Sequence, residues 1–441
     1  MFYFNVFAYI CHQQNIISTK QSMIKSIQAK CRWLLSRPFW VSPRFWWALW
    51  LLLAVAGALS KLFSYGNPES FRHHCNNFLI FRGTFWHALE GLSLYAPYPA
   101  EYGDTNHYGP FFSLFVAPFA LPPAFIGLLL WVIFLTWWLY MAVRRSTFTH
   151  SQQAFIILFC AHELLTAVFM MQFNIAIAAI LLLTFYCVER EKDFWAAAWM
   201  MLGTFVKLYG IVGLAFFFFS KHKGRFVLSL MFWAFVLLIA PACLHGFDYL
   251  WQQYGEWYAS LTDKNAQNLL STMQNVSLLG IIRKTTGILT YSDLWIIVPG
   301  FILFGIPYLR RAQYRFLAFR QTILASALMF TVLFSTGSES SSYIIALVGV
   351  VIWFTAAPWR RSTADVALMV FVFILTSLSP SDLFPAFLRR EYVYPYALKA
   401  LPVTLVWLKL CFEMCTRSYG PMETAGHENC ETSDATALTT T

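Results

Sequence analysis

The sequence predicts an all-α polytopic membrane protein with roughly 11 to 13 transmembrane helices. Of the 441 residues, 59% are apolar and only 12% are charged, whereas about a quarter of a soluble domain is charged. Apolar runs recur along the whole chain, so no long stretch is left for a separate soluble enzyme domain. The 44 Phe and 18 Trp residues suit lipid-facing surfaces and the aromatic belts at membrane interfaces.

Three segments follow one another along the chain. Residues 1–42 are mixed, with basic residues after an apolar start, and no small-residue cleavage site follows a short apolar core. We therefore expect a cytoplasmic segment there and not a secretory signal. Residues 43–415 form one transmembrane domain, and the tail 416–441, rich in Thr, Glu and Ser, is expected to be a disordered cytoplasmic segment. The apolar runs predict spans at 45–63, 124–143, 154–171, 173–188, 194–208, 209–219, 226–245, 293–308, 319–335, 343–356, 364–378 and 400–415.

Clusters of basic residues set the expected orientation. They all fall on one side of the predicted spans, at 144–145, 190–192, 221–225, 310–315 and 360–361. The positive-inside rule puts that side in the cytoplasm, so the outer loops are 64–123, 246–292 and 379–399. The same rule accounts for the net charge of +10, so the lipid bilayer is the expected partner and nucleic acid is not.

The first outer loop begins with a predicted amphipathic helix. Apolar residues recur at helical spacing over residues 76–91, at Phe78, Phe81, Phe85, Leu89 and Leu92. Such a helix is expected to lie in the membrane interface. The later run 110–121 ends in Pro122 and Pro123, which a helix cannot pass, and predicts a re-entrant or juxtamembrane helix.

Between these two helices lies the segment most suited to chemistry. Glu101 and Asp104 stand among the rings of Tyr102, His107 and Tyr108, with Pro and Gly restricting the backbone. A base, rings that stack on a sugar and a rigid frame predict a carbohydrate or lipid-headgroup site. The alternative is equally open: Tyr is common at any membrane interface, and loop acids are usually solvated.

Polar residues also stand inside apolar runs. Glu163 lies within a predicted span, and a charge at membrane depth costs at least about 2.5 kcal/mol. Gln172 and Asn174 follow about three helical turns later, so Asn174 and Glu163 are candidates to share a helix face. Lys207 lies between two short spans beside glycines, as a candidate ligand of a lipid phosphate. The alternatives are a polar pin between helices for Glu163 and snorkelling to the headgroups for Lys207.

The remaining candidates lie near the outer face. Arg283, Arg389 and Lys399 are basic on the side where basic residues are unexpected, which indicates either a lipid-linked phosphate or simple headgroup contact. Glu339 stands among serines, either as a second site acid or in a helix-capping run. The nine Cys show no CxxC or Cys/His ligand spacing, so the sequence predicts no metal site.

The order of motifs resembles glycosyltransferase family 87 over about residues 45–415. The motifs are Tyr-Gly-Pro-Phe-Phe at 108–112, Ala-Leu-Pro-Pro at 120–123, Gln-Phe-Asn at 172–174 and Gly-Thr-Phe-Val-Lys-Leu-Tyr at 203–209. The resemblance implies a polyprenyl-phosphate-mannose-dependent mannosyltransferase with the GT-C membrane fold. It also implies a glycolipid or glycan acceptor, an active site on the non-cytoplasmic side and a bacterial inner membrane.

The family's base is an Asp of the first outer loop, in an Asp-Phe-x-x-Tyr stretch. Here the stretch begins with Asn77, which takes no proton at neutral pH. We therefore expect Asp104 to be the base with Glu101 as its partner, leaving Glu163 and Glu339 as alternatives and Asn77 as a substrate ligand.

The leading hypothesis is an inverting transferase that needs no cofactor. A carboxylate accepts the proton of the acceptor hydroxyl, and Lys207, with Arg283 or Arg389, stabilises the departing lipid phosphate. Two alternatives stay open: a transporter or flippase of lipid-linked sugars, and a catalytically silent partner in envelope assembly, which Asn77 favours.

Overall fold

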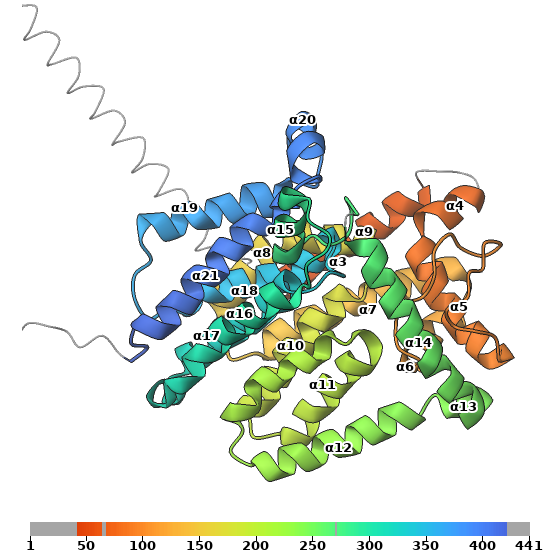
Figure 1. Ribbon diagram of the computed structural model, residues 1–441, viewed down its shortest axis with the longest axis horizontal. Coiled ribbons are helices and arrows are strands. Elements are labelled where there is room, and N and C mark those ends of the chain that lie inside the picture. Colours follow the sequence, from red (N-terminus) through yellow and green to blue (C-terminus); the bar gives the residue numbers. More distant parts are fainter. Residues whose placement is uncertain (1–41, 64–67, 270, 421–441) are drawn as a thin grey trace, which may run out of the picture. The chain divides into compact units, whose positions relative to one another are not determined.

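The computed structural model describes residues 42–63, 68–269 and 271–420. Within these ranges every regular element is a helix and there is no strand, which confirms the predicted all-α class (Figure 1). The chain divides into two compact units, Met1–Leu52 and Leu53–Thr441, and their boundary lies inside helix α3 (Pro43–Phe63). The second unit contains every helix from α4 (Pro68–His74) onward. The predicted cytoplasmic segment 1–41 and the tail from residue 421 lie outside the described residues.

Apolar helices follow one another through the chain, as a polytopic membrane protein requires. Among the described residues, three stretches are long and apolar enough to cross a membrane: 19 residues of α3, α7 (Ala124–Arg145), and α12 with α13 (Lys223–His245). The pair α8 (His150–Phe159) and α9 (Ala161–Phe169) passes the same test together, with a bend of 48°. The shorter apolar helices are α6 (Phe111–Ala120), α10 (Asn174–Glu189), η1 (Tyr209–Phe219), α16 with η2 (Leu294–Leu309), α17 (Leu317–Leu333), η4 with α18 (Ser340–Ala356) and α19 with η5 (Thr363–Leu378). The number of crossings stays a prediction.

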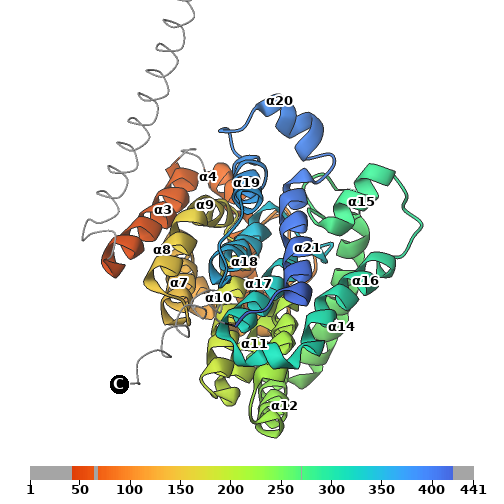
Figure 2. The ribbon, with the colours of Figure 1, turned by 90° about the vertical axis from the view of Figure 1, so that its left-hand side faces the viewer.

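The core of the second unit is built around α10 and α18. Nearly every side chain of both helices is buried. Helix α17 packs along α18, while α10 packs against α7, α11 (Asp193–Lys207) and η1. A Cβ at Gly349 of α18 would lie only 2.7 Å from the Ala325 carbonyl oxygen of α17, so the glycine permits this close approach. Helix α21 (Leu401–Thr416) packs against both α17 and α18 (Figure 2).

The three predicted outer loops contain helices of their own. The first holds α4, α5 (Asn76–Glu90) and α6; the second holds α14 (Phe247–Asn268) and α15 (Leu278–Thr286); the third holds α20 (Ala386–Leu388), η6 (Arg389–Val393) and η7 (Leu398–Ala400). Helix α5 is the predicted amphipathic helix. Its Phe78, Phe81 and Phe85 are buried within the protein, and it packs against α6. The three phenylalanines of the apolar stripe therefore face the protein, whereas Leu89 and Leu92 at its end are exposed.

Candidate functional site

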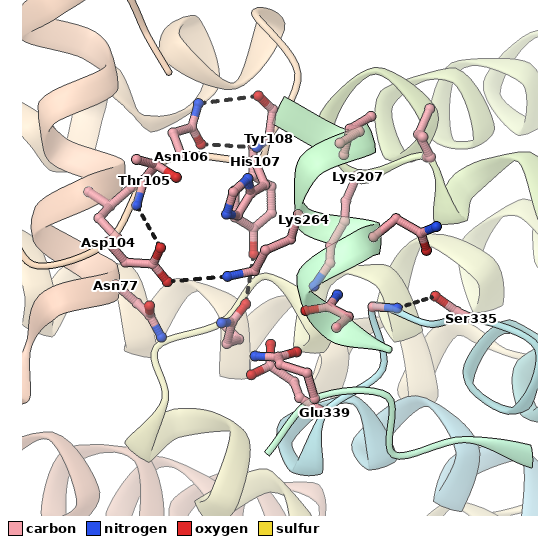
Figure 3. A pocket seen from close by; sticks show the side chains of 18 of the residues that line it. Asn77, Asp104, Thr105, Asn106, His107, Tyr108, Lys207, Lys264, Ser335 and Glu339 are labelled. Carbon is pink, nitrogen blue, oxygen red and sulfur yellow. Dashed lines mark hydrogen bonds and ion pairs between the residues drawn. The ribbon is translucent and has the colours of Figure 1, made fainter. Parts of the chain in front are cut away.

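A cavity of about 490 Å³ lies where the first and second outer loops meet the ends of the apolar helices (Figure 3). Its walls come from α5, the loop after Gly103, the turn before α10, the junction of α11 and η1, α14, and the loop after α17. Its lining contains two carboxylates, Asp104 and Glu339, and two ammonium groups, Lys207 and Lys264. Opposite charges thus share a space large enough for a small polar ligand.

Helix α14 holds the first-loop segment in place through hydrogen bonds along one of its faces. Near its start, the Tyr249 hydroxyl donates to the Leu92 carbonyl (2.7 Å), and Gln253 Oε1 accepts from the Leu94 backbone N–H (2.8 Å). The Glu256 carboxylate accepts from the Ser93 hydroxyl.

The same face continues toward the cavity. Trp257 Nε1 donates to the His107 carbonyl (3.0 Å), and the Ser260 hydroxyl lies 3.2 Å from the Asn106 carbonyl. At the far end of the segment, the Gly109 N–H donates to the Val206 carbonyl (3.0 Å), which ties the loop to α11. These contacts fix the segment that carries Asp104.

Asp104 and Glu101, predicted as partners, point to different places. Asp104 lines the cavity: its Oδ1 accepts from the Thr105 N–H (2.8 Å) and its Oδ2 lies 3.5 Å from Lys264 Nζ (Figure 3). About half of the Asp104 side chain is exposed, so it is open to a ligand. Glu101 lies outside the lining and pairs with His87 at 3.2 Å, beside the buried ring of Tyr102.

Lys207 reaches the cavity because α11 ends at that residue. Leu208 takes a left-handed conformation (φ 47°), and a Cβ at Gly210 would collide with the Thr204 nitrogen at 2.4 Å, so glycine is required for the chain to turn back on α11. The helix break expected beside the glycines is thereby confirmed. Lys207 Nζ donates to Asn174 Oδ1 (2.7 Å), and Asn174 in turn donates to Ser341.

The aromatic wall beside Lys207 comes from two tyrosines. The rings of Tyr108 and Tyr209 have their centroids 5.5 Å and 5.3 Å from Lys207 Nζ. The Tyr108 hydroxyl donates to Gln172 Oε1 (2.8 Å), and Tyr108, Tyr209 and Gln172 all line the cavity. Aromatic faces attract an ammonium electrostatically, which favours this position of Lys207.

Glu339 lines the cavity from the loop that follows α17. It caps the short helix η4 (Ser340–Ser342), its backbone N–H donating to Ser342 Oγ (3.2 Å). The preceding residue, Ser338, accepts from the Val276 N–H (2.8 Å), which joins this loop to the second outer loop. Burial raises the pKa of Glu339, while Lys207 and Lys264 oppose that rise. Glu339 is therefore both the cap of a helix and an acid in the cavity lining, the two positions that the sequence left open.

His107 is the imidazole of the cavity. Its Nδ1 lies 2.7 Å from Ser260 Oγ. Because the Ser260 hydroxyl has one proton and the Asn106 carbonyl can only accept, the serine donates to the carbonyl and accepts from Nδ1–H. Burial, with the nearby charge of Lys264, lowers the pKa of His107 to about 4, so the ring is neutral near pH 7.

Glu163 and Lys399, two other predicted site residues, pair with each other outside the cavity. Lys399 Nζ lies 2.9 Å and 3.1 Å from the two Glu163 oxygens, and it also donates to the carbonyl and hydroxyl of Ser340. The buried ion pair thus links α9 to η7, which is the structural alternative to a site role that the sequence left open for Glu163. Glu163 and Asn174 do not share one helix face, because α9 ends at Phe169 and the left-handed Met171 separates it from α10.

Arg283 and Arg389 also have protein partners and lie outside the cavity lining. The buried Arg283 pairs with Asp293 at 2.6 Å and donates to the Leu289 carbonyl (3.0 Å), so it organises its own loop. Arg389 pairs with the exposed Asp382 at 2.9 Å in the last outer loop.

The sequence interpretation missed Lys264 and the part of α14 around it. The cavity residues of this helix recur at helical spacing, at Trp257, Leu261, Lys264, Asn265 and Asn268. That periodicity is readable in the sequence. Only the folded chain shows that this face meets a loop more than 150 residues away, through the Asp104–Lys264 contact.

Comparison with known protein families gives a match. A model of glycosyltransferase family 87 matches residues 106–336, slightly more than half of the chain. The matched range contains both lysines of the cavity, His107 and most of the helices that build its walls. No curated protein matches the chain. The protein is thus an all-helical membrane protein that belongs to glycosyltransferase family 87.

Proposed function

We propose that this protein transfers mannose from a polyprenyl-phosphate donor to a glycolipid or glycan acceptor on the non-cytoplasmic face of a bacterial inner membrane. One observation carries the proposal: in a glycosyltransferase of this family, one cavity brings an open carboxylate, Asp104, together with two lysines, Lys207 and Lys264. A carboxylate suits proton abstraction and ammonium groups suit a phosphate.

Lys207 and Lys264 are the proposed phosphate ligands. Among the described residues, Lys207 donates one hydrogen bond, to Asn174, and an ammonium has three N–H donors. Within the described part of the chain, the ion pair of Lys264 is a long one, with 3.5 Å to Asp104 Oδ2. Arg283, Arg389 and Lys399 are engaged with acids elsewhere, so we assign the phosphate to the two cavity lysines.

Asp104 is the proposed base. Its carboxylate accepts the proton of the acceptor hydroxyl while that oxygen forms a bond to the anomeric carbon. The bond from the anomeric carbon to the phosphate oxygen breaks, and its electron pair leaves with the phosphate, which the lysines stabilise. Attack opposite the leaving group inverts the anomeric centre. Glu339, whose pKa burial raises, is assigned the role of balancing the charge of the two lysines.

The orientation of the cavity is part of the proposal. The positive-inside rule puts residues 221–225 in the cytoplasm and the cavity loops on the other side. Single cysteines introduced at 105 and 267 should react with an impermeant thiol reagent from outside intact cells, and one at 222 should not. Labelling of the cysteine at 222, without labelling of the cysteines at 105 and 267, would contradict this orientation.

The function is tested with the purified protein, radiolabelled polyprenyl-phosphate mannose and a lipid extract as the source of acceptor. We expect label to move to a new lipid or glycan product whose anomeric configuration is inverted. Label that remains on the donor, with the donor bound, would contradict transfer and favour a transporter. A product with the donor's configuration would contradict inversion alone.

A further inference from the structure

We infer that Asn77 and Gln172 form a subsite that recognises hydroxyl groups of the transferred sugar, with Asn77 Oδ1 as acceptor and Gln172 Nε2 as donor. This inference rests on the proposed function, because it places the sugar in the same cavity. Both residues line that cavity. Neither amide titrates near neutral pH, so the pair recognises the substrate and does not act as an acid or base.

Asn77 is oriented by a bond that leaves its oxygen free. Its Nδ2 donates to the Met170 carbonyl at 2.8 Å. A carbonyl can only accept, so the amide NH₂ must face Met170 and Oδ1 must point the other way. No donor among the described residues is bonded to Oδ1, and the residue lines the cavity. Oδ1 is therefore an acceptor open to a ligand.

Gln172 is oriented in the opposite sense. Its Oε1 accepts from the Tyr108 hydroxyl at 2.8 Å, so its Nε2 points the other way. The two protons of Gln172 Nε2 have no acceptor among the residues that the structure describes. Residues 170–172 form a turn in which Met171 has φ 54°. The Met171 carbonyl accepts from Trp131 Nε1 (2.8 Å), which holds the turn in place.

Each amide lies near one of the two proposed positions, Gln172 near the phosphate ligand Lys207 and Asn77 near the base Asp104. Gln172 is bonded to Tyr108, whose ring lies 5.5 Å from Lys207 Nζ. At the other side, Asn76 Oδ1 accepts from the Gly103 N–H (2.6 Å), which brings the start of α5 to the residue before Asp104, and Figure 3 shows Asn77 and Asp104 on the same side of the cavity. A sugar with its phosphate at Lys207 and its anomeric carbon toward Asp104 would extend past both amides.

A sugar hydroxyl matches this pair because it donates one hydrogen bond and accepts others. Asn77 Oδ1 takes the proton of a hydroxyl, and Gln172 Nε2 donates to the same oxygen or to its neighbour. Both amides are held by the protein at their far atoms, so little side-chain entropy is lost when the sugar binds. A sugar without the matching hydroxyl would leave the amides unpaired and should therefore bind more weakly.

Binding of two lipids to the purified full chain tests the subsite. One lipid is a short polyprenyl phosphate, and the other is the same lipid carrying mannose. We expect wild type to bind the mannosyl lipid about tenfold more tightly than the bare phosphate, as two neutral hydrogen bonds predict. Asn77→Ala and Gln172→Leu should lose most of this gain and keep their affinity for the bare phosphate. The control Gln267→Leu, at an exposed position outside the cavity lining, should behave as wild type.

A second comparison identifies the hydroxyl. Among mannosyl lipids that each lack one hydroxyl, at least one should bind wild type more weakly than the complete mannosyl lipid does, and Gln172→Leu should not weaken its binding further. Gln172→Glu keeps an oxygen that accepts from the Tyr108 hydroxyl but lacks the Nε2 donor. It should therefore lose as much of the gain from mannose as Gln172→Leu does, while the hydrogen bond to Tyr108 is kept. Equal loss of affinity for bare and mannosyl lipid in these variants would overturn the subsite. Failure of wild type to bind either lipid would overturn the proposed function instead.

Discussion

The ammonium of Lys399 lies 2.9 Å from Glu163 Oε1, across 236 residues of sequence, and both side chains are buried. Lys399 also binds the carbonyl and hydroxyl of Ser340, at 3.1 Å and 2.9 Å. Ser340 follows Glu339, which lines the cavity. The pair therefore joins α9 and η7 to the loop that carries the acid of the candidate site.

Breaking this pair on one side should be more harmful than removing both charges. Glu163→Gln or Lys399→Met leaves one buried charge unpaired, which costs about 3 to 5 kcal/mol, whereas the double variant leaves none. We expect the thermal midpoint in detergent to fall clearly for each single variant and to recover partly in the double variant. Strictly additive losses in this double-mutant cycle would contradict a direct ion pair.

The positions of the helices follow from local sequence pattern. The predicted span 173–188 is α10 at Asn174–Glu189, and the predicted stop at Pro122 coincides with the end of α6. Apolar runs and helix breakers act within a few residues, so they are readable without the fold. The break at Lys207 was readable for the same reason, from the glycines on either side.

Which residues line the cavity depends on contacts between segments that are far apart in the sequence. Asp104, Lys207 and Glu339 were candidates by residue type, and the fold brings them to one space. Arg283 and Glu163 were candidates by the same reasoning, yet each is paired elsewhere, with Asp293 and Lys399. A charge in an unexpected place indicates that a partner exists. It does not indicate whether that partner is a substrate or another side chain.

Loss of either cavity lysine should weaken binding of the lipid phosphate. Lys207→Met or Lys264→Met removes one charge-assisted hydrogen bond, so we expect the Kd for polyprenyl phosphate to rise about 10- to 100-fold. Arg389→Met is the matched control, because Arg389 pairs with exposed Asp382 outside the cavity lining. Titration by intrinsic fluorescence measures all three. An effect of Arg389→Met as large as that of the lysine variants would place the phosphate elsewhere.

The depressed pKa of His107 predicts a loss of stability in acid. Burial, together with Lys264, lowers this pKa from 6.5 to about 4 in the folded protein. Below pH 6.5 the unfolded chain binds a proton that the folded chain does not, so stability falls between pH 6.5 and about pH 4, by about 3 kcal/mol at most. We expect His107→Asn to show a smaller drop in thermal midpoint from pH 7.5 to pH 5.

The exposed His150 supplies the control for this comparison. His150→Asn should keep the full drop in thermal midpoint that wild type shows over the same pH range. If His107→Asn lost as much stability in acid as wild type does, the imidazole would not be held neutral by its surroundings.

The central claim is that Asp104 is the base of sugar transfer in this cavity, and the single-turnover transfer rate at saturating donor tests it most directly. Asp104→Asn keeps the side-chain volume and an acceptor for the Thr105 N–H but takes up no proton. The account predicts a fall of about a hundredfold or more in this rate with the donor Kd nearly unchanged, and a rate close to wild type for Glu101→Gln, which lies outside the cavity lining. A near-normal rate for Asp104→Asn, with transfer abolished in Glu339→Gln or Glu163→Gln, would contradict it.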